Sequence, residues 1–450
     1  MKNILVLGAG QSTPYLIRRL LDRADANGWF VTVGDLNLAL ARERVDHHPR
    51  GEAIKFDVTD TALLAGQVAK ADLVVNLLAP VFQHQVAWEC VEHGTHMISA
   101  SYRDRHIRDL HTNAERRGVL ILNEVGLDPG IDHMSAMALI HRIRKAGGRV
   151  TSFISYGSGV PAPDSLSNPL KYVITWNPRN VVMSAEHGAQ YLIDGKIKIV
   201  PYPHVFQRSW PVEVDGLGTM EAYPNRDSLS YRQTYGLEHV HTMIRGTLRW
   251  PGWSETWLQI VRLGLPNENM RVPDFKQRTY AEITEMFIPR NVAGAVLEQR
   301  VATHLNISPT GQIMDNLRWL GLFCDEPIGI DGETAADMMM HLLCRKLALG
   351  PQERDMVVLV HELEVCYSQP DNRRERITTT LIEYGQPDGF TAMSRTVGLP
   401  AAISAELLLN GEIPLTGCHI PTHPAIYTPI LAELKNEGLV FKEKTTSLSP

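Results

Sequence analysis

An apolar segment near the start of the chain runs directly into a turn with two glycines, and this combination constrains the fold most strongly. Ile4–Leu7 contains no polar residue, which indicates a strand buried on both faces. Gly8 and Gly10 follow it. They leave room for a tight turn and for close approach of the backbone to a pyrophosphate. The sequence therefore predicts a dinucleotide-binding turn directly after this strand.

The residues after the glycines suit the start of a helix. Ser12 or Thr13 can cap that helix, and Pro14 suits its first turn, where a missing N–H group costs nothing. The N–H groups and the positive end of the helix dipole would then face phosphates, beside Gln11 and Ser12. Thr13 stands where the dinucleotide fingerprint has its third glycine, so the prediction needs support from the residues that follow.

Asp35 supplies that support. It ends the second predicted strand, Phe30–Asp35, at about the separation expected for an acid that binds the adenosine ribose. The alternative is that Asp35 is only a helix cap or a turn residue.

Strand-like and helix-like segments then alternate along the chain. The short apolar segments predicted as strands are Ala53–Asp57, Asp72–Leu78, His96–Ser101 and Val119–Val125. The amphipathic segments predicted as helices are Ala62–Ala69, Gln83–His93 and Asp104–Arg117. This alternation predicts an α/β fold with a Rossmann-type, doubly wound parallel sheet.

Length, charge and cysteine content exclude several classes of protein. The 450 residues suffice for two or three domains, and the net charge of −6 provides no basic field for nucleic acid. No apolar run is long enough for a membrane span, and the chain enters a strand at once, so we expect neither a membrane helix nor a signal peptide. The five cysteines are scattered without a CxxC pair, which indicates a reduced, cytoplasmic protein without a metal site.

Changes of pattern along the chain predict three parts. The expected boundaries are a dinucleotide-binding domain at 1–130, completed by 391–450; an α+β substrate-binding domain at 131–250 with 351–390; and a helical insertion at 251–350. The later predicted helices are Ile131–Ala146, Thr256–Leu263, Val292–Leu305, Met314–Leu320, Thr334–Leu349, Ala392–Arg395, Pro400–Leu409 and Ile426–Glu437. The later predicted strands are Val150–Gly157, then Asp355–Tyr367 and Ile377–Tyr384, which flank the polar turn Ser368–Arg374.

The loop after the sixth predicted strand carries the strongest catalytic candidate. Asp128 precedes a proline in the segment 126–133, at the carboxyl edge of the sheet where ligands bind in open α/β folds. We predict that it pairs with a substrate amine or relays a proton. The alternative is that Asp128 caps the helix that begins at Ile131. For Asp132 and His133, inside that helix, a structural role is favoured.

Other strand ends should meet at the same edge. Ser101 and Tyr102 end the fifth strand and offer two hydroxyl groups for a carboxylate or a ribose; the alternative for Ser101 is a cap for the following helix. The backbone at Leu77 and Leu78 should lie near the cofactor, and Asp57 with Val58 near the adenine.

Arginines in the loop-rich middle of the chain indicate the substrate. Arg226, Arg245 and Arg249 lie next to Gly, Asn and Thr, which suits two-pronged binding of carboxylates, and Arg179 is a further candidate. Each charged hydrogen bond contributes about 1.5–3 kcal/mol. As a set, these arginines favour a small polyanionic substrate.

These segments resemble saccharopine dehydrogenases of the glutamate-forming type. The similar segments are Gly-Leu-Asp-Pro-Gly-Ile-Asp-His at 126–133, Asn-Pro-Leu-Lys-Tyr at 168–172, Tyr-Pro-Asn-Arg-Asp-Ser at 223–228, Arg-Gly-Thr-Leu-Arg at 245–249, Glu-Arg-Asp-Met-Val at 353–357 and Val-Gly-Leu-Pro at 397–400. The resemblance implies a Rossmann domain, an α+β domain and a helical insertion. It also implies a reaction in which glutamate and 2-aminoadipate 6-semialdehyde condense to an imine that NAD(P)H reduces to saccharopine, or the reverse oxidation in lysine metabolism.

The resemblance also assigns roles to matching positions. Those that fall at saccharopine contacts are Ser101, Tyr102, Asp128, Arg226, Arg245, Gly246 and Thr247. Those that fall at or beside cofactor positions are Gly8, Gly10, Asp57, Val58, Leu77, Leu127 and Trp176. Asp128 and Tyr102 are the candidates for catalysis: Asp128 would stabilise the iminium, and Tyr102 would bond the secondary amine or a carboxylate.

Two positions depart from the family pattern. Fungal-type members usually carry an arginine after the second strand, which suits the 2′-phosphate of NADP, whereas this chain has Asp35 followed by Leu36. Like charges about 4 Å apart, at an effective dielectric of about 20, repel by about 4 kcal/mol, so we predict NAD over NADP. Arg42 and Arg44 could reach back and favour NADP. Gly157 replaces a cysteine that is frequent in the family, so a mechanism that needs that thiol is not expected here.

Two rival functions remain at this point. A carboxynorspermidine or carboxyspermidine dehydrogenase of the same superfamily would bind several ammonium groups, for which the arginine loops are unsuited. A non-catalytic NAD(H)-binding sensor would bind cofactor without turnover. The expected partner is a small amino-acid substrate, with neither nucleic acid nor membrane, and a homodimer is one option for the oligomeric state.

Overall fold

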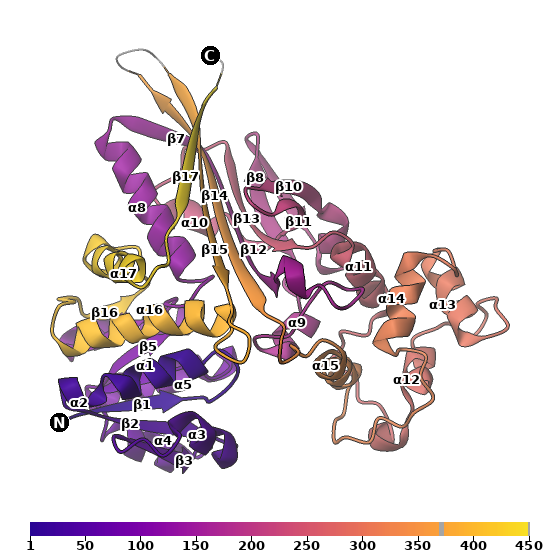
Figure 1. Ribbon diagram of the computed structural model, residues 1–450, viewed down its shortest axis with the longest axis horizontal. Helices are drawn as coiled ribbons and strands as arrows, with labels where there is room; N and C mark the ends of the chain where they lie inside the picture. The colour runs from indigo at the N-terminus through magenta and orange to yellow at the C-terminus, as the bar shows by residue number, and fades with distance from the viewer. Residues whose placement is uncertain (369–372, 449–450) are drawn as a thin grey trace. The chain divides into compact units, whose positions relative to one another are not determined.

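The computed structural model describes residues 1–368 and 373–448 (Figure 1). The chain forms two compact units. Unit 1 consists of Met1–Val150, Val365–Glu375 and Leu381–Pro450, and unit 2 of Thr151–Glu364 and Arg376–Thr380. The three-part division expected above stays a prediction, and residues 131–150, expected in the substrate domain, belong to unit 1.

Unit 1 is built on a seven-stranded sheet in the order β16-β6-β5-β4-β1-β2-β3. Its strands are β1 (Lys2–Leu7), β2 (Trp29–Asp35), β3 (Gly51–Lys55), β4 (Leu73–Asn76), β5 (His96–Ser99), β6 (Leu120–Leu122) and β16 (Gly417–His419). All neighbouring strands are parallel. The strand order reverses between β1 and β4, and the carboxyl ends of strands at such a reversal form the ligand-binding crevice of doubly wound folds.

The helices of unit 1 are α1 (Pro14–Asp22), α2 (Ala24–Asn27), α3 (Leu38–Val45), α4 (Thr61–Val68), η1 (Pro80–Phe82), α5 (Gln83–His93), α6 (Arg105–Asp109), α7 (His111–Arg116), α8 (Ile131–Lys145), α16 (Ala392–Leu409) and α17 (Pro424–Asn436). Several of them, such as α5 and α16, pack on its sheet. Strand side chains such as Leu5, Val74 and Met97 pack with Val86 and Val91 of α5 in one buried cluster. Complete burial of each such side chain contributes about 1.5–3 kcal/mol. The predicted doubly wound sheet is therefore confirmed.

The helix α16 corrects one sequence prediction. Instead of the two predicted helices, Ala392–Arg395 and Pro400–Leu409, a single helix spans Ala392–Leu409 with Pro400 inside it. A proline inside a helix costs about 3 kcal/mol locally. Here α16 is almost fully buried and packs along α1, so tertiary packing outweighs that cost (Figure 1). A Cβ atom at Gly398 would lie 2.7 Å from the backbone nitrogen of Leu16, so glycine permits this close approach.

A second sheet has the order β10-β11-β13-β7-β14-β15-β17; beside this order, β8 pairs with β13, and β9 and β12 each pair with β8. Its strands are β7 (Gly148–Pro161), β8 (Ala189–Ile193), β9 (Lys196–Val200), β10 (Trp210–Val214), β11 (Gly218–Pro224), β12 (Arg226–Asp227), β13 (Thr242–Arg249), β14 (Asp355–Tyr367), β15 (Arg374–Tyr384) and β17 (Lys442–Leu448). Parallel and antiparallel pairs are mixed, as in β13 with β7 and with β11. The predicted turn at Ser368–Arg374 falls largely on residues 369–372, outside the described part.

The helices of unit 2 are α9 (Pro178–Val182), α10 (Ser230–Thr234), α11 (Trp253–Leu263), α12 (Tyr280–Met286), α13 (Leu297–Leu305), α14 (Gln312–Leu320) and α15 (Ala335–Lys346), with short helical turns η2 (Pro163–Ser165), η3 (Tyr202–Arg208) and η4 (Phe275–Gln277). The helix α12 was not predicted from the sequence, although Thr279 and Glu282 form a capping box at its start. The helix expected from Val292 begins only at Leu297, after the left-handed Gly294.

Candidate functional site

The glycine turn joins β1 to α1 at the carboxyl edge of the unit 1 sheet. Gly8 has a φ of 101°, and its N–H donates to the carbonyl of Gly34 at 2.8 Å. No atom lies within 4 Å of the position of a Cβ at Gly10, so the space beside the turn is open. That open side next to a helix N-terminus fits a pyrophosphate.

The start of α1 differs from the prediction in its cap. Thr13 is the N-cap residue, but neither it nor Ser12 caps the helix, because the Thr13 hydroxyl donates to the carbonyl of Gly10 at 2.8 Å. Pro14 occupies the first turn as expected. Gln11 is exposed and Ser12 half-buried in this turn. Thr13 therefore gives the first turn of α1 no cap, but the N–H of Tyr15 in that turn donates to the Ser394 hydroxyl of α16 at 3.0 Å, so this donor is already used.

Asp35 is held by two backbone donors. Its Oδ2 accepts from the N–H of Ala9 at 2.8 Å, and its Oδ1 accepts from the N–H of Asn37 at 2.7 Å. Asn37, not Asp35, caps α3. Arg44 from α3 reaches the same turn, since its Nε donates to the carbonyl of Ala9 at 3.4 Å, and it pairs with Glu43 at 2.6 Å.

The chain forms local turns after β3 and after β4. The Asp57 carboxylate accepts from the N–H and the hydroxyl of Thr59, and these bonds lower the pKa of the Asp57 carboxyl. Val58 is buried. Leu77 and Leu78 are half-buried, and the Leu78 carbonyl accepts from the Gln83 amide at 2.9 Å. These positions lie where the sequence placed them, and their contact with a cofactor stays a prediction.

The strand β5 ends two residues earlier than expected. The Ser99 hydroxyl donates to Gln83 Oε1 at 2.7 Å and accepts from the N–H of Ser101 at 3.1 Å, which turns the chain away from the sheet. Asp104 caps α6, so Ser101 is not that cap. Ser101 and Tyr102 are half-buried at the carboxyl edge.

The loop from Val125 to Gly130 forms a compact turn with a cis bond between Asp128 and Pro129. The N–H of Gly126 donates to the carbonyl of Pro129 at 3.0 Å. Gly130 has a φ of 150°, and a Cβ there would lie 2.0 Å from the carbonyl oxygen of Gly126, so only glycine fits. Gly130 is the N-cap of α8, which corrects the alternative that Asp128 caps it. Asp128 is half-buried, and the neighbouring Leu127 is buried.

Glu124 is a residue of this site that the sequence analysis did not identify. It is 4% exposed, its Oε1 accepts from the N–H of Arg103 at 2.9 Å, and its Oε2 lies 2.7 Å from His133 Nε2. His133 is fully buried. The sequence around Glu124 does not distinguish it from a surface residue, because its partners Arg103 and His133 lie on two other segments.

In unit 2 the segment that leads from β11 to Arg226 lies beside β13. Pro224 pairs with Gly246 and Tyr223 with Thr247, while the N–H of Arg245 donates to the buried Ser228 hydroxyl at 2.9 Å. These contacts bring together the predicted substrate residues of unit 2, which are Arg226, Arg245, Gly246 and Thr247. Arg226 is exposed with a φ of 51°.

The remaining arginine candidates differ in their surroundings. The Arg245 guanidinium lies 4.4 Å from the ring centre of Tyr231 and is 4% exposed. Arg249 is also buried, over the ring of Tyr172, and donates to Ser158 at 3.3 Å. Arg179 pairs with Glu268 and Asp337 instead. The prediction that Arg179 contacts substrate is therefore replaced by a structural role that ties α9 to α15.

Two further unit 2 positions have defined neighbours. Trp176 is half-buried, and its indole N–H donates to the Tyr172 hydroxyl at 3.1 Å. Gly157 pairs with Thr247 in the register of β7 and β13. The residue that replaces the family's frequent cysteine thus lies beside a predicted substrate residue.

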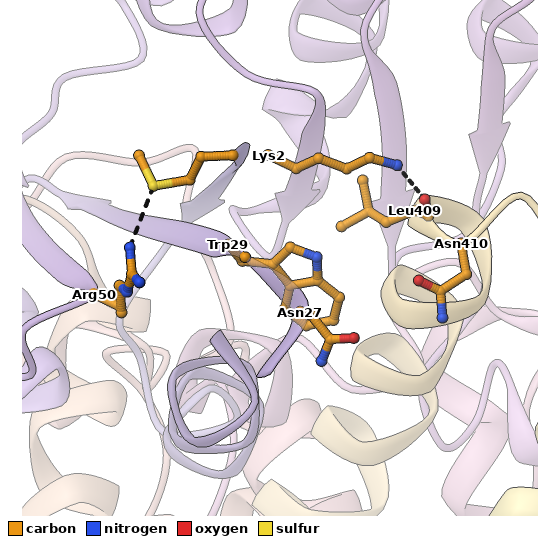
Figure 2. A pocket seen from close by; sticks show the side chains of 8 residues that line it. Lys2, Asn27, Trp29, Arg50, Leu409 and Asn410 are labelled. Carbon is orange, nitrogen blue, oxygen red and sulfur yellow. Dashed lines mark hydrogen bonds between the residues drawn. The ribbon is translucent and has the colours of Figure 1, made fainter. Parts of the chain in front are cut away.

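Unit 1 also has a pocket elsewhere, with a volume of about 420 Å³. Figure 2 shows the side chains that line it. It is lined at the amino ends of β1 and β2 by Lys2 and Trp29, with Arg50 and Asn410. The Lys2 ammonium group donates to the carbonyl of Leu409. Because ligands of doubly wound sheets bind at the carboxyl ends of the strands, this cavity is not the dinucleotide site.

The described part of the chain contains no helix that is both long and apolar enough to cross a membrane. Its five cysteines form no disulfide. A cytoplasmic location stays a prediction.

The strand order, the glycine turn and the Asp35 position define the class: a Rossmann-type dinucleotide-binding protein with a second, mixed-sheet unit. Two family models cover most of the sequence, "Saccharopine dehydrogenase NADP binding domain" at residues 4–122 and "Saccharopine dehydrogenase C-terminal domain" at 126–439. The chain belongs to the saccharopine dehydrogenase family.

Individual relatives agree with this assignment. The chain is 33% identical to saccharopine dehydrogenase [NADP(+), L-glutamate-forming] of Saccharomyces cerevisiae, over 99% of this chain and 100% of the relative. The solved apo structure of saccharopine dehydrogenase (L-Glu forming) from that yeast matches with a TM-score of 0.85, at 32% identity, over 99% of this chain and 100% of that one. The mitochondrial alpha-aminoadipic semialdehyde synthase of Mus musculus is 33% identical over 99% of this chain and 48% of the relative, so the chain spans about half the length of that relative.

Proposed function

We propose that the chain interconverts saccharopine with glutamate plus 2-aminoadipate 6-semialdehyde by hydride transfer to or from a nicotinamide cofactor. The observation that carries this proposal is the match to the whole length of the yeast enzyme, in sequence and in fold. Arg226 and Arg245 of unit 2 support it, because saccharopine carries three carboxylates and a guanidinium group can bind a carboxylate through two hydrogen bonds.

The residues of unit 1 fit the cofactor. The open side of Gly10 suits the pyrophosphate, and the fixed carboxylate of Asp35 suits the adenosine ribose. A bound nicotinamide supplies the hydride acceptor or donor, and the protein supplies orientation and electrostatics.

The substrate-side roles follow from charge and burial. Arg245 is fixed in place by the Tyr231 ring and would bind one carboxylate, while the exposed Arg226 on the adjoining loop would bind another. Asp128 would stabilise the protonated imine, since a carboxylate favours a nearby cation and the protonated imine accepts hydride more readily. Tyr102, with Ser101, would donate hydrogen bonds to the amine or to a carboxylate.

For the cofactor we propose NAD as the faster partner. The names of the fungal relatives and the description of the family model support NADP. Asp35 supports NAD, because its carboxylate is held by Ala9 and Asn37 at the end of β2, where a 2′-phosphate would meet a like charge. Arg44 is the residue by which NADP would be accommodated, and its pairing with Glu43 reduces the positive charge that it offers.

A single assay tests the reaction and the cofactor together. Saccharopine is incubated with the protein and either NAD or NADP, and the absorbance of the reduced nicotinamide is followed. We expect turnover with both glutamate and the semialdehyde as products, faster with NAD. Binding of NAD(H) without turnover would favour a sensor, and turnover of carboxyspermidine but not of saccharopine would favour the polyamine enzyme. A large advantage of NADP would overturn the proposal for Asp35.

The role of Asp128 has its own test. Asp128→Asn should lower kcat by about 10- to 100-fold, because one charged contact to the reacting group is lost, as for other electrostatic stabilisers. The dissociation constant of NADH, measured by fluorescence, should stay unchanged. Unaltered kinetics in this variant would remove Asp128 from the mechanism.

A further inference from the structure

One buried carboxylate connects the two substrate-side segments of unit 1. Glu124 follows β6 directly, and its backbone N–H donates to the carbonyl of Ser101 at 3.1 Å. Its Oε1 accepts from the N–H of Arg103 at 2.9 Å, so backbone and side chain together bind the segment 101–103. This segment contains Tyr102.

The other oxygen of Glu124 points to α8. Oε2 lies 2.7 Å from Nε2 of the fully buried His133, an ion-pair distance at which the two atoms do not have hydrogen-bond geometry, and the opposite ring nitrogen of His133 lies 3.4 Å from Asp132 Oδ2. Asp132 Oδ1 in turn accepts from the N–H of Gly130 at 2.6 Å. The chain of contacts therefore ends on the last residue of the loop that carries Asp128.

The backbone at Glu124 is itself unfavourable for a residue with a side chain. Its φ of 62° lies in the left-handed region, where glycine or asparagine is usual. Such a conformation persists only where the surroundings fix it, and it occurs often at functional sites. A buried carboxylate at the same position is a second unfavourable feature, since apolar side chains fill a core at lower cost. Stability alone therefore does not explain Glu124.

We propose that Glu124 and His133 form a positioning pair that holds the segment 101–103 and the Asp128 loop in one fixed relation. The pair acts on the reaction only through Tyr102 and Asp128, and this role rests on the proposed function. The sequence predicted a structural role for His133, and in this proposal His133 also helps to position Tyr102 and Asp128.

The test is a double-mutant cycle on saccharopine oxidation. Glu124→Gln keeps the shape and one oxygen but removes the charge opposite His133, and a shift of the loop by about 1 Å should lower kcat/KM by about 30-fold. In the Asp128→Asn background the same change should cost about threefold or less, because residues that act as a unit are not additive. A loss of equal size in both backgrounds would show that Glu124 does not act through Asp128 and would overturn the proposal.

Glu89→Gln is the matched control. Glu89 on α5 also faces a histidine, His93 at 3.5 Å, and its side chain is 13% exposed. The same chemical change there should leave kcat/KM within about twofold of the wild type. Should Glu124→Gln fail to fold, His133→Gln replaces it, because it disturbs the pair from the other side and leaves the contact of Glu124 with Arg103.

A readout without substrate separates this proposal from the proposed function. Amide hydrogen exchange should rise at 99–105 and at 124–133 together in Glu124→Gln, and at neither segment in Glu89→Gln. A protein inactive on saccharopine but with this paired response would disprove the function and keep the coupling of the two segments. Increased exchange at only one of the segments would disprove the coupling.

Discussion

Replacement of Asp35 by asparagine should reverse much of the cofactor preference. Both carboxylate oxygens of Asp35 accept short backbone hydrogen bonds, so the charge is fixed at the end of β2. A phosphate oxygen about 4 Å away, at an effective dielectric of about 20, is repelled by about 4 kcal/mol. Asp35 is half-buried, and solvent screening that leaves a third of this energy still corresponds to about a tenfold effect.

The variant should therefore gain about tenfold in kcat/KM with NADP. It should lose about tenfold with NAD, because the amide nitrogen of asparagine cannot accept a hydrogen bond, and the loss of one charged hydrogen bond costs about 1.5 kcal/mol. Initial rates with both cofactors at saturating saccharopine measure the ratio, and Asp22→Asn, which removes an exposed carboxylate paired with Arg18 on α1, is the control. An unchanged ratio would refute the reasoning, and it would leave Arg44 as the main determinant.

Three further outcomes follow from contacts already described. Arg245→Lys should raise the KM for saccharopine about tenfold, because an ammonium group replaces two-pronged carboxylate binding over Tyr231, and an unchanged KM would disprove the role. Gly398→Ala should destabilise unit 1 by about 2 kcal/mol in urea unfolding, since its Cβ would press on Leu16; full stability would show that α16 can shift. Burial, with a nearby lysine, lowers the pKa of His96, whose Nδ1 accepts a backbone N–H of β6, so the folded state favours neutral imidazole. Below a pH of about 6.5 the unfolded chain binds more protons, and the free energy of unfolding should fall with acidification, but less so in His96→Gln.

Local patterns were enough to predict the first sheet. The apolar segments at β1 to β6 and the glycine turn each carry their signal within a few residues, and the helix α5 was predicted with its observed bounds. Recurrent motifs were also enough to predict the family. Elements that depend on distant partners were not predictable: β16 is only three residues long and becomes a strand by pairing with β6.

In the candidate site too, local patterns were enough for some residues, whereas others depended on contacts with distant parts of the chain. Asp128 and Ser101 were correctly placed at the sheet edge, yet their possible roles as caps could be decided only from the observed ends of α6 and α8. Arg179 looked like a substrate ligand until its partners Glu268 and Asp337, far away in the sequence, were visible. Glu124 escaped notice because its significance depends on contacts with two separate segments.

The late arrival of β16 has a consequence for biosynthesis. A ribosome releases the first six strands of the sheet long before it makes the seventh, and α16, which packs on α1, also comes late. Until then one sheet edge and the surface of α1 stay uncovered in the nascent chain, and closure over such a long stretch is slow. Chaperones that bind exposed strand edges should therefore remain associated with this polypeptide until α16 and β16 have been made.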